Sequence, residues 1–446
     1  MDNIFFLSCF LPLVLVVHWL APGLKSKNAV LLVFSLLFYS LSGMSALMLL
    51  LGVALANFLL GLALKRGACK KAALTAGLLL DIGFLAFFKY ADFFLSGILG
   101  LETLQNSIAV PLGISFFTFK CISYLMDAYR DGDQATGSFC DLLLYVSFFP
   151  QITMGPITRF REFAPLLKDR TVSMQNTAQG LRRFAAGLGK KILIAGTVAS
   201  VADGVFQLEQ VDIRLAWVGA IAYCIQLYFD FSGYIDMVIG LGTCFGFATR
   251  ENFNYPYTAV SIGGFWRRWH MSLSTWFKDY LYIPLGGNRK GKLRAGINKS
   301  IVFLLCGLWH GAFSLLESRN VIPAKKLETG KGRIVGHIYT LLVVCIGFVM
   351  FRATSAAQGV QIIAAMFAGF RFTAAGTVAL HRLLNAQTIL AMAAGVALSM
   401  PLAKKLMTRL GKYADSLSYL GALALLALCI IKMAAGNFAP SIYAQF

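Results

Sequence analysis

Histidine, tryptophan and basic side chains gather in one stretch of this sequence, residues 252–310. The stretch contains His270 and His310, two of the five histidines, and four of the six tryptophans. A histidine whose pKa lies near neutral can remove a proton from a hydroxyl group, so this stretch could catalyse transfer to an alcohol. Its aromatic rings and basic side chains could also bind a nucleotide, by stacking on the base and pairing with the phosphates.

His310 lies within an apolar run that begins at Ile301. A helix that starts there would carry the imidazole roughly 14 Å into a hydrocarbon core about 30 Å thick, at about 1.5 Å per residue. Gly307 and Gly311 flank Trp309 and His310, and would let a substrate or another backbone approach closely. The pattern favours a general base near mid-membrane. The alternative is a neutral imidazole that only hydrogen-bonds between helices.

His270 lies in the segment 265–280, and we consider the case in which this segment is helical. On such a helix Trp266, Trp269, Trp276 and His270 would fall mostly at spacings of three and four residues and form an aromatic stripe. This stripe is typical of an interfacial helix whose aromatic rings lie at the level of the lipid headgroups. It could instead be a surface on which an adenine stacks while nearby basic side chains meet phosphates.

The elements that must position these groups are apolar. Of the 446 residues, 58% are hydrophobic and only 13% are charged, against about 25% charged residues in soluble domains; the mean hydropathy is +0.70. The apolar runs are continuous and approach the roughly 20 residues of a membrane-spanning helix. We therefore predict an all-α polytopic membrane protein with one domain over residues 1–446. It should have about ten or eleven transmembrane helices, with re-entrant and interfacial helices besides.

The net charge of +20 arises from Lys and Arg in short connections between apolar runs. That is the positive-inside pattern, so we expect a basic cytoplasmic face and no nucleic-acid partner. The nine cysteines form no CxxC pair, and neither a P-loop, a G-x-S-x-G nor an HExxH motif occurs. The sequence therefore predicts no disulfide framework, no metal and no tightly bound cofactor.

Several polar side chains lie inside apolar runs. Lys120 could extend toward the membrane surface or face a cavity, and the first is favoured. Asp230 and Asp236 must be paired or face a cavity. Basic residues among apolar ones in 177–194 indicate an interfacial amphipathic helix. Glycine and proline interrupt 139–160, which suggests a re-entrant segment.

An ordered series of motifs runs over nearly the whole chain. The motifs are PLGISFFTF (111–119), FFPQITMGPITRF (148–160), FDFSGYIDMVIGLGTCFGF (229–247), ENFNYPY (251–257), FWRRWHMSLSTWFKDYLYIPLGGNR (265–289), GLWHG (307–311) and FRA (351–353). This series resembles the membrane-bound O-acyltransferases, in particular the branch of bacterial alginate and peptidoglycan O-acetyltransferases.

The resemblance implies a funnel or tunnel through the bacterial cytoplasmic (inner) membrane. It implies acetyl-CoA as the cytoplasmic donor, with an acceptor hydroxyl on an exported polysaccharide or on an extracytoplasmic SGNH-type carrier protein, and lipid around the domain. His310 matches the family's nearly invariant histidine, and His270 matches a second functional position. We expect acyl-CoA contacts from Trp266, Arg267, Trp269, Asp279 and Trp309.

The sequence departs from the family after His310. The apolar run 301–316 is followed directly by Glu317 and Arg319, where members of the family usually continue with another apolar, Trp-rich stretch and a further His-Gly. This departure motivates one alternative to the enzyme hypothesis, a catalytically impaired scaffold that binds a partner. A second alternative, from another class of protein, is a transporter or flippase for a lipid-linked or acyl species. Transfer of the acyl group by the purified protein would separate the enzyme from the transporter.

Overall fold

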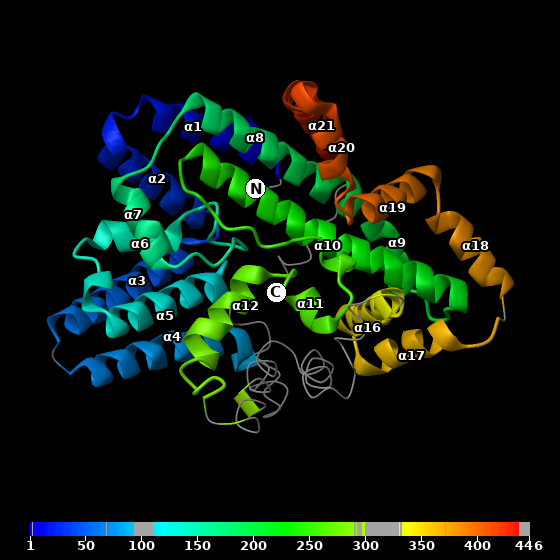
Figure 1. Ribbon diagram of the computed structural model, residues 1–446, viewed down its shortest axis with the longest axis horizontal. Coiled ribbons are helices and arrows are strands. Elements are labelled where there is room, and N and C mark those ends of the chain that lie inside the picture. Colours follow the sequence, from blue (N-terminus) through cyan, green and yellow to red (C-terminus); the bar gives the residue numbers. More distant parts are fainter. Residues whose placement is uncertain are drawn as a thin grey trace. The chain divides into compact units, whose positions relative to one another are not determined.

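The computed structural model describes residues 1, 3–67, 69–92, 110–289, 291, 297–298, 330, 332–370 and 372–436. These residues form helices and connections, without a strand among them (Figure 1). They divide into two compact units. Unit 1 comprises Met1–Leu181 and Val238–Arg250, and unit 2 comprises Arg182–Met237 and Glu251–Phe446. A single domain over the whole chain stays a prediction.

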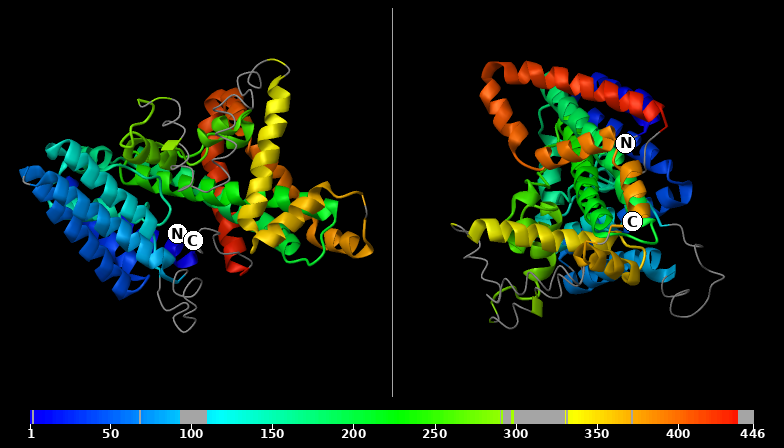
Figure 2. Two further views of the ribbon diagram at one scale, coloured as in Figure 1. Left: turned by 90° about the horizontal axis from the view of Figure 1, so that it is seen from below. Right: turned by 90° about the vertical axis from the view of Figure 1, so that its right-hand side faces the viewer.

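Unit 1 is built from short and long helices in chain order. They are η1 (Phe6–Phe10), α1 (Leu11–Leu20), α2 (Gly23–Ser40), α3 (Met44–Arg66), α4 (Lys70–Asp92), α5 (Ile114–Arg130), η4 (Gly132–Gln134), α6 (Phe139–Ser147) and α7 (Phe160–Lys168). Helices α3, α4 and α5 pack on one another and lie side by side in Figures 1 and 2. Gly61 of α3 faces the ring of Tyr124, and Gly77 of α4 faces Leu125. Because any side chain at either glycine would overlap these α5 residues, the two glycines permit the close packing.

Two helices contain the boundaries between the units, α8 (Met174–Gly189) and α10 (Ile213–Cys244). The remaining helices belong to unit 2. They are η5 (Lys190–Ala195), α9 (Gly196–Phe206), η6 (Pro256–Thr258), α11 (Ile262–Trp266), α12 (Met271–Phe277), η7 (Lys278–Tyr282), α16 (Gly332–Arg352), α17 (Ala356–Phe367), α18 (Ala374–Leu383), α19 (Ala386–Leu398), α20 (Leu402–Leu410), η8 (Gly411–Tyr413) and α21 (Ala414–Ala434).

The predicted all-α membrane class is confirmed. Six helices of the described residues are long and apolar enough to cross a membrane, or seven if the bent pair α19–α20 forms one span. The six are Met44–Arg66, Lys70–Ala91, Met174–Phe206, Ile213–Cys244, Gly332–Arg352 and Ala414–Ala434. Large apolar side chains such as Leu79, Phe87 and Leu420 are exposed on these helices, as expected for surfaces that contact lipid.

Two expectations about basic residues are wrong. The segment 177–194 is not an interfacial helix, because it belongs to the continuous helix Met174–Phe206, most of which is buried. Three of its cations, Arg183, Lys190 and Lys191, face acidic side chains of α10, and Arg182 pairs with Asp415 of α21. Lys120 does not extend toward the surface either. Its side chain is buried, and the Nζ atom donates a hydrogen bond to the Tyr145 carbonyl oxygen at 2.8 Å.

The segment 139–160 is interrupted, as its proline and glycine residues predict. Helix α6 ends at Ser147, and the chain is not helical again until α7 begins at Phe160. Gly113 at the start of α5 lies against the backbone of this interruption, at Ile152 and Thr153. Because its φ is +69°, glycine is favoured at that position.

Candidate active site

The site is built on two long helices of unit 2 that approach each other closely. A Cβ atom at Gly187 would lie 2.5 Å from the carbonyl oxygen of Gly233 and 2.7 Å from the amide nitrogen of Met237. Both glycines are therefore needed for the backbones of α8 and α10 to come this near. The close approach places the cations of the first helix directly opposite the acids of the second.

Asp236 of α10 is the centre of an ion-paired cluster. The Nη2 atom of Arg183 donates to Asp236 Oδ1 at 2.8 Å, and Nζ of Lys190 donates to Oδ2 at 2.6 Å. The same guanidinium group donates two hydrogen bonds to the carboxylate of Glu251, at 2.7 and 2.6 Å. Glu251 follows the end of α10, so the cluster fixes the chain as it leaves that helix.

A second pair lies deeper between the same helices. Lys191 and Asp230 form an ion pair in which the side chains are only 1% and 7% exposed. The prediction that Asp230 and Asp236 are paired is thus confirmed for both residues. Removal of either member of a buried pair leaves an uncompensated charge, which is strongly destabilising.

Asn252 follows Glu251 directly and holds the backbone around His270. Its carbonyl oxygen accepts a hydrogen bond from the Met271 amide at 3.0 Å, and its Oδ1 accepts one from the Ser272 amide at 2.9 Å. The Asn252 side-chain amide also contacts His270 Nδ1, at 3.3 Å from Nδ2 and 3.4 Å from Oδ1. Asn252 is fully buried, so its side chain has a fixed place from which to orient the imidazole.

His270 occupies a break between two helices. Its φ is +46°, a conformation that residues other than glycine rarely adopt, and α11 ends four residues before it while α12 begins at the next residue. Figure 1 shows α11 and α12 as two separate short helices. The continuous helix considered for 265–280 is therefore not formed. The amides of Met271 and Ser272 bond to Asn252 instead of preceding turns, which explains the break.

Aromatic rings surround the imidazole on the protein side. Phe231 meets the His270 ring edge-on at a centroid distance of 4.9 Å, and Phe253 lies 5.0 Å from both Phe231 and Trp269. Trp269 is buried and stacks on Phe265 at 5.5 Å. Trp269 therefore helps to build the wall behind His270 rather than an exposed stacking surface.

Burial lowers the pKa of His270 from 6.5 to about 3. The imidazole is therefore neutral near pH 7, with one nitrogen able to donate a hydrogen bond and the other able to accept one. A neutral imidazole in this position can orient a hydroxyl or a carbonyl group, or exchange a proton with it.

The other predicted site residues are less closely grouped. Trp266 is half-buried against Phe265, at 5.2 Å between ring centroids, while Arg267 is exposed at the end of α11. Asp279 is half-buried in η7. His310 and Trp309 lie outside the described residues. In the part of the chain that is described, no three His, Cys, Asp or Glu side chains gather closely enough to hold a metal ion.

Sequence reasoning missed two features of the site. It gave no role to Asn252, although this asparagine is the second residue of the ENFNYPY motif (251–257). It also placed Arg183 and Lys190 at an interface, although two acids were expected to need partners. The acids in the apolar run of α10 and the cations in 177–194 both needed partners of opposite charge, and assigning them to each other would have suggested the cluster.

The described residues thus define a multi-pass helical membrane protein that carries a neutral histidine on a helix break. The chain belongs to the membrane-bound O-acyltransferase family (MBOAT), whose family model matches residues 31–316. It is 40% identical over 386 residues to the probable alginate O-acetylase AlgI of Pseudomonas syringae pv. tomato, covering 81% of this chain and 74% of that protein.

Two other relatives cover similar shares of the chain. The probable alginate O-acetylase AlgI of Pseudomonas putida is 41% identical over 383 residues, which are 81% of this chain and 79% of that protein. The peptidoglycan O-acetyltransferase of Helicobacter pylori is 38% identical over 348 residues, which are 69% of this chain and 66% of that protein. The protein is therefore an enzyme of the O-acyltransferase class, as the motifs predicted.

Proposed function

We propose that this protein transfers the acetyl group of cytoplasmic acetyl-CoA to a hydroxyl group on the other side of the bacterial cytoplasmic membrane. The acceptor is an exported polysaccharide or an SGNH-type carrier protein that passes the acetyl group on. The named relatives act on alginate and on peptidoglycan, and the positive-inside charge pattern gives an anionic CoA a basic cytoplasmic face to approach.

One observation carries the proposal: a neutral imidazole, held by a buried asparagine, occupies a strained break in the segment that matches the family's motif. The contact with Asn252 engages Nδ1 of His270. The Nε2 atom is then the nitrogen that would meet a substrate. Strained backbone of this kind persists where surrounding contacts hold it, and is common at functional sites.

The reaction assigns different roles to the two histidines. His310 accepts the proton of the acceptor hydroxyl while the oxygen attacks the thioester carbonyl. The C–S bond then breaks, and the CoA thiolate leaves and takes the proton from the imidazolium. His270 orients the reacting groups by hydrogen bonding. A positioned base contributes about 10²–10⁴-fold, and bringing the two substrates together contributes the remainder by proximity.

The test uses the purified protein in liposomes, with acetyl-CoA and an acceptor polysaccharide or its carrier protein. His310→Ala should lower acetyl transfer by about 10²–10⁴-fold. His270→Ala should also lower it, because the neutral imidazole is lost. The matched control is His381→Ala, which removes an exposed histidine of α18 and should leave the rate unchanged.

The outcomes separate the candidate functions. Undiminished transfer by His310→Ala, at normal protein levels, would contradict the assigned base. A wild-type protein that neither transfers acetyl groups nor releases CoA thiol would indicate a scaffold or a transporter instead, since neither needs thioester chemistry.

A further inference from the structure

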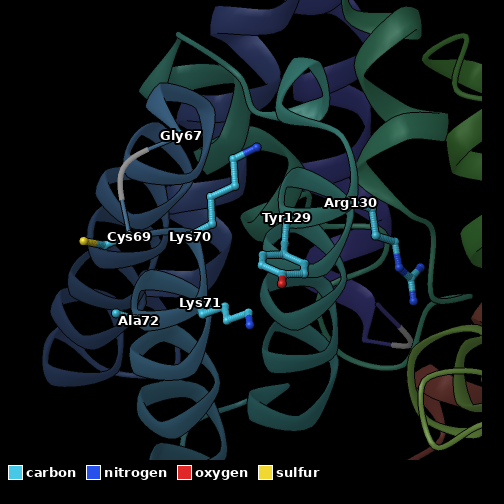
Figure 3. A pocket seen from close by; sticks show the side chains of 7 residues that line it. All are labelled: Gly67, Cys69, Lys70, Lys71, Ala72, Tyr129 and Arg130. Atoms are coloured by element: carbon cyan, nitrogen blue, oxygen red, sulfur yellow. The ribbon is translucent and has the colours of Figure 1, made fainter.

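A basic pocket lies in unit 1, between the start of α4 and the end of α5. It has a volume of about 730 Å³ and is lined by Gly67, Cys69, Lys70, Lys71, Ala72, Tyr129 and Arg130. Figure 3 shows the two lysines on one side of the pocket, with Tyr129 and Arg130 on the other. Most of its lining residues are exposed, so the pocket opens widely to the surface.

The lining carries three cationic side chains and no acidic one. Lys70 and Lys71 occupy the first turn of α4, in which there is no acidic residue. Cations at this end of a helix oppose the helix dipole. Lys65 and Arg66, at the end of α3, add further positive charge nearby. An anion in the pocket would relieve this repulsion.

The nearest carboxylates are engaged elsewhere. Asp131 accepts hydrogen bonds from the Gln134 side chain at 3.2 Å and from the Asp133 amide at 3.1 Å. These bonds, and to a smaller extent the charge of Lys70, lower the pKa of Asp131. The buried Asp127 lies 3.7 Å from Arg130, so it compensates part of the charge of that one lining residue and none of the charge of the two lysines. Among the described residues neither Lys70 nor Lys71 forms an ion pair.

The pocket lies where two membrane-spanning helices meet the membrane surface. Helix α3 ends at Arg66, α4 begins at Lys70, and both are long and apolar enough to span. Their junction is therefore at the level of the lipid headgroups, where tyrosines such as Tyr129 are enriched. The positive-inside rule places the basic junction on the cytoplasmic side, whose leaflet carries anionic lipids.

We propose that this pocket binds the headgroup phosphate of an anionic phospholipid of the cytoplasmic leaflet. Lys70, Lys71 and Arg130 supply the positive charge, and the Tyr129 hydroxyl group supplies a neutral donor. The position at headgroup level favours a lipid over the phosphates of acetyl-CoA, which are the other source of the same chemistry.

The experiment measures binding of short-chain phosphatidylglycerol to the purified, detergent-solubilised protein, with phosphatidylcholine of the same chain length as the neutral comparison. The variant Lys70→Gln/Lys71→Gln/Arg130→Gln should bind phosphatidylglycerol at least about tenfold more weakly. Its control, Lys404→Gln/Lys405→Gln/Arg409→Gln, changes the net charge equally on the exposed face of α20 and should bind like the wild type.

A single substitution tests the proposal even if the triple variant does not fold. Lys71 is exposed, so Lys71→Gln should leave the fold intact and weaken binding about fivefold. The proposal would be overturned if the pocket variant and the control variant lost phosphatidylglycerol binding to the same extent. It would also be overturned if the wild type bound phosphatidylcholine as tightly as phosphatidylglycerol. Acetyl-CoA that displaces phosphatidylglycerol from the wild type would also overturn it, by assigning the pocket to the donor.

Discussion

Buried acids occur in membrane-spanning helices of both units, but their partners differ. In unit 1, Asp81 of α4 is 1% exposed, and the partner it has among the described residues is the neutral amide of Asn57, at 2.9 Å. In unit 2, Asp230 and Asp236 of α10 face Lys and Arg side chains. The buried acid of α4 is thus stabilised by a neutral group, and the two acids of α10 are stabilised by opposite charge.

The difference implies different protonation states. An ionised carboxylate that is buried without a cation costs several kcal/mol. Asp81 Oδ2 and Asn57 Oδ1 are both buried and lack hydrogen-bond partners among the described residues. A proton on Asp81 Oδ2 would make that atom a hydrogen-bond donor. Asn57 Oδ1 is a buried acceptor that could receive such a bond. The geometry therefore predicts a neutral carboxyl group at Asp81, in contrast to the ion-paired acids Asp230 and Asp236.

The largest expected effect comes from breaking the pair with the least exposure. Lys191→Met removes the cation that faces the buried Asp230 carboxylate, and should lower the free energy of unfolding by about 3–5 kcal/mol. Lys191→Met/Asp230→Leu removes both charges and should recover most of that loss. The measurement is thermal and denaturant unfolding in detergent. A double variant as unstable as the single one would show that the ion pair is not the cause.

A smaller loss is expected at the partly exposed cluster. Asp236→Asn leaves Arg183 and Lys190 without their shared carboxylate, and should cost about 2 kcal/mol, since the side chain is 16% exposed. Glu251→Gln is the control on the same guanidinium. At 58% exposure its pair should contribute less than about 1 kcal/mol. Equal losses in the two variants would mean that burial does not determine the contribution of each acid.

The pair formed by Asn252 and His270 belongs to unit 2 and yet is neutral, which a pH series can test. The pKa of His270 is about 3 in the folded protein and 6.5 without burial. As the pH falls below about 6.5, the unfolded chain takes up a proton that the folded protein excludes. Stability is therefore lost as the pH decreases through this window.

Between pH 7 and pH 5 the contribution of His270 to this loss should amount to about 1–2 kcal/mol, so His270→Gln should lose that much less stability than the wild type. The buried His18 contributes a dependence of its own, which the variant keeps. Unfolding midpoints at pH 5, 6 and 7 measure it. His381→Gln removes an exposed histidine and should retain the wild-type dependence on pH. If His270→Gln kept that dependence too, the imidazole would not be the group responsible.

Features that depend on composition could be predicted from the sequence. Features that depend on contacts between residues distant in the chain could not. Continuous apolar runs were sufficient for the helical membrane class, and the cost of burying a charge was sufficient to predict partners for Asp230 and Asp236. The helix break at His270 was missed, because it depends on Asn252, which lies eighteen residues earlier and accepts hydrogen bonds from the backbone amides of Met271 and Ser272. Periodicity within 265–280 carries no information about that contact.

The smallest expected effect concerns the neutral acid of unit 1. In Asp81→Asn, a side-chain amide hydrogen replaces the carboxyl proton and can donate to Asn57 Oδ1, so stability should change by less than about 1 kcal/mol. The same Asp→Asn substitution at Asp236 should cost about 2 kcal/mol, which makes the two variants a matched pair. Unfolding in detergent at pH 7 compares them directly. Because a neutral acid has no charge to lose and an ionised acid does, equal destabilisation would mean that Asp81 is ionised in the folded protein.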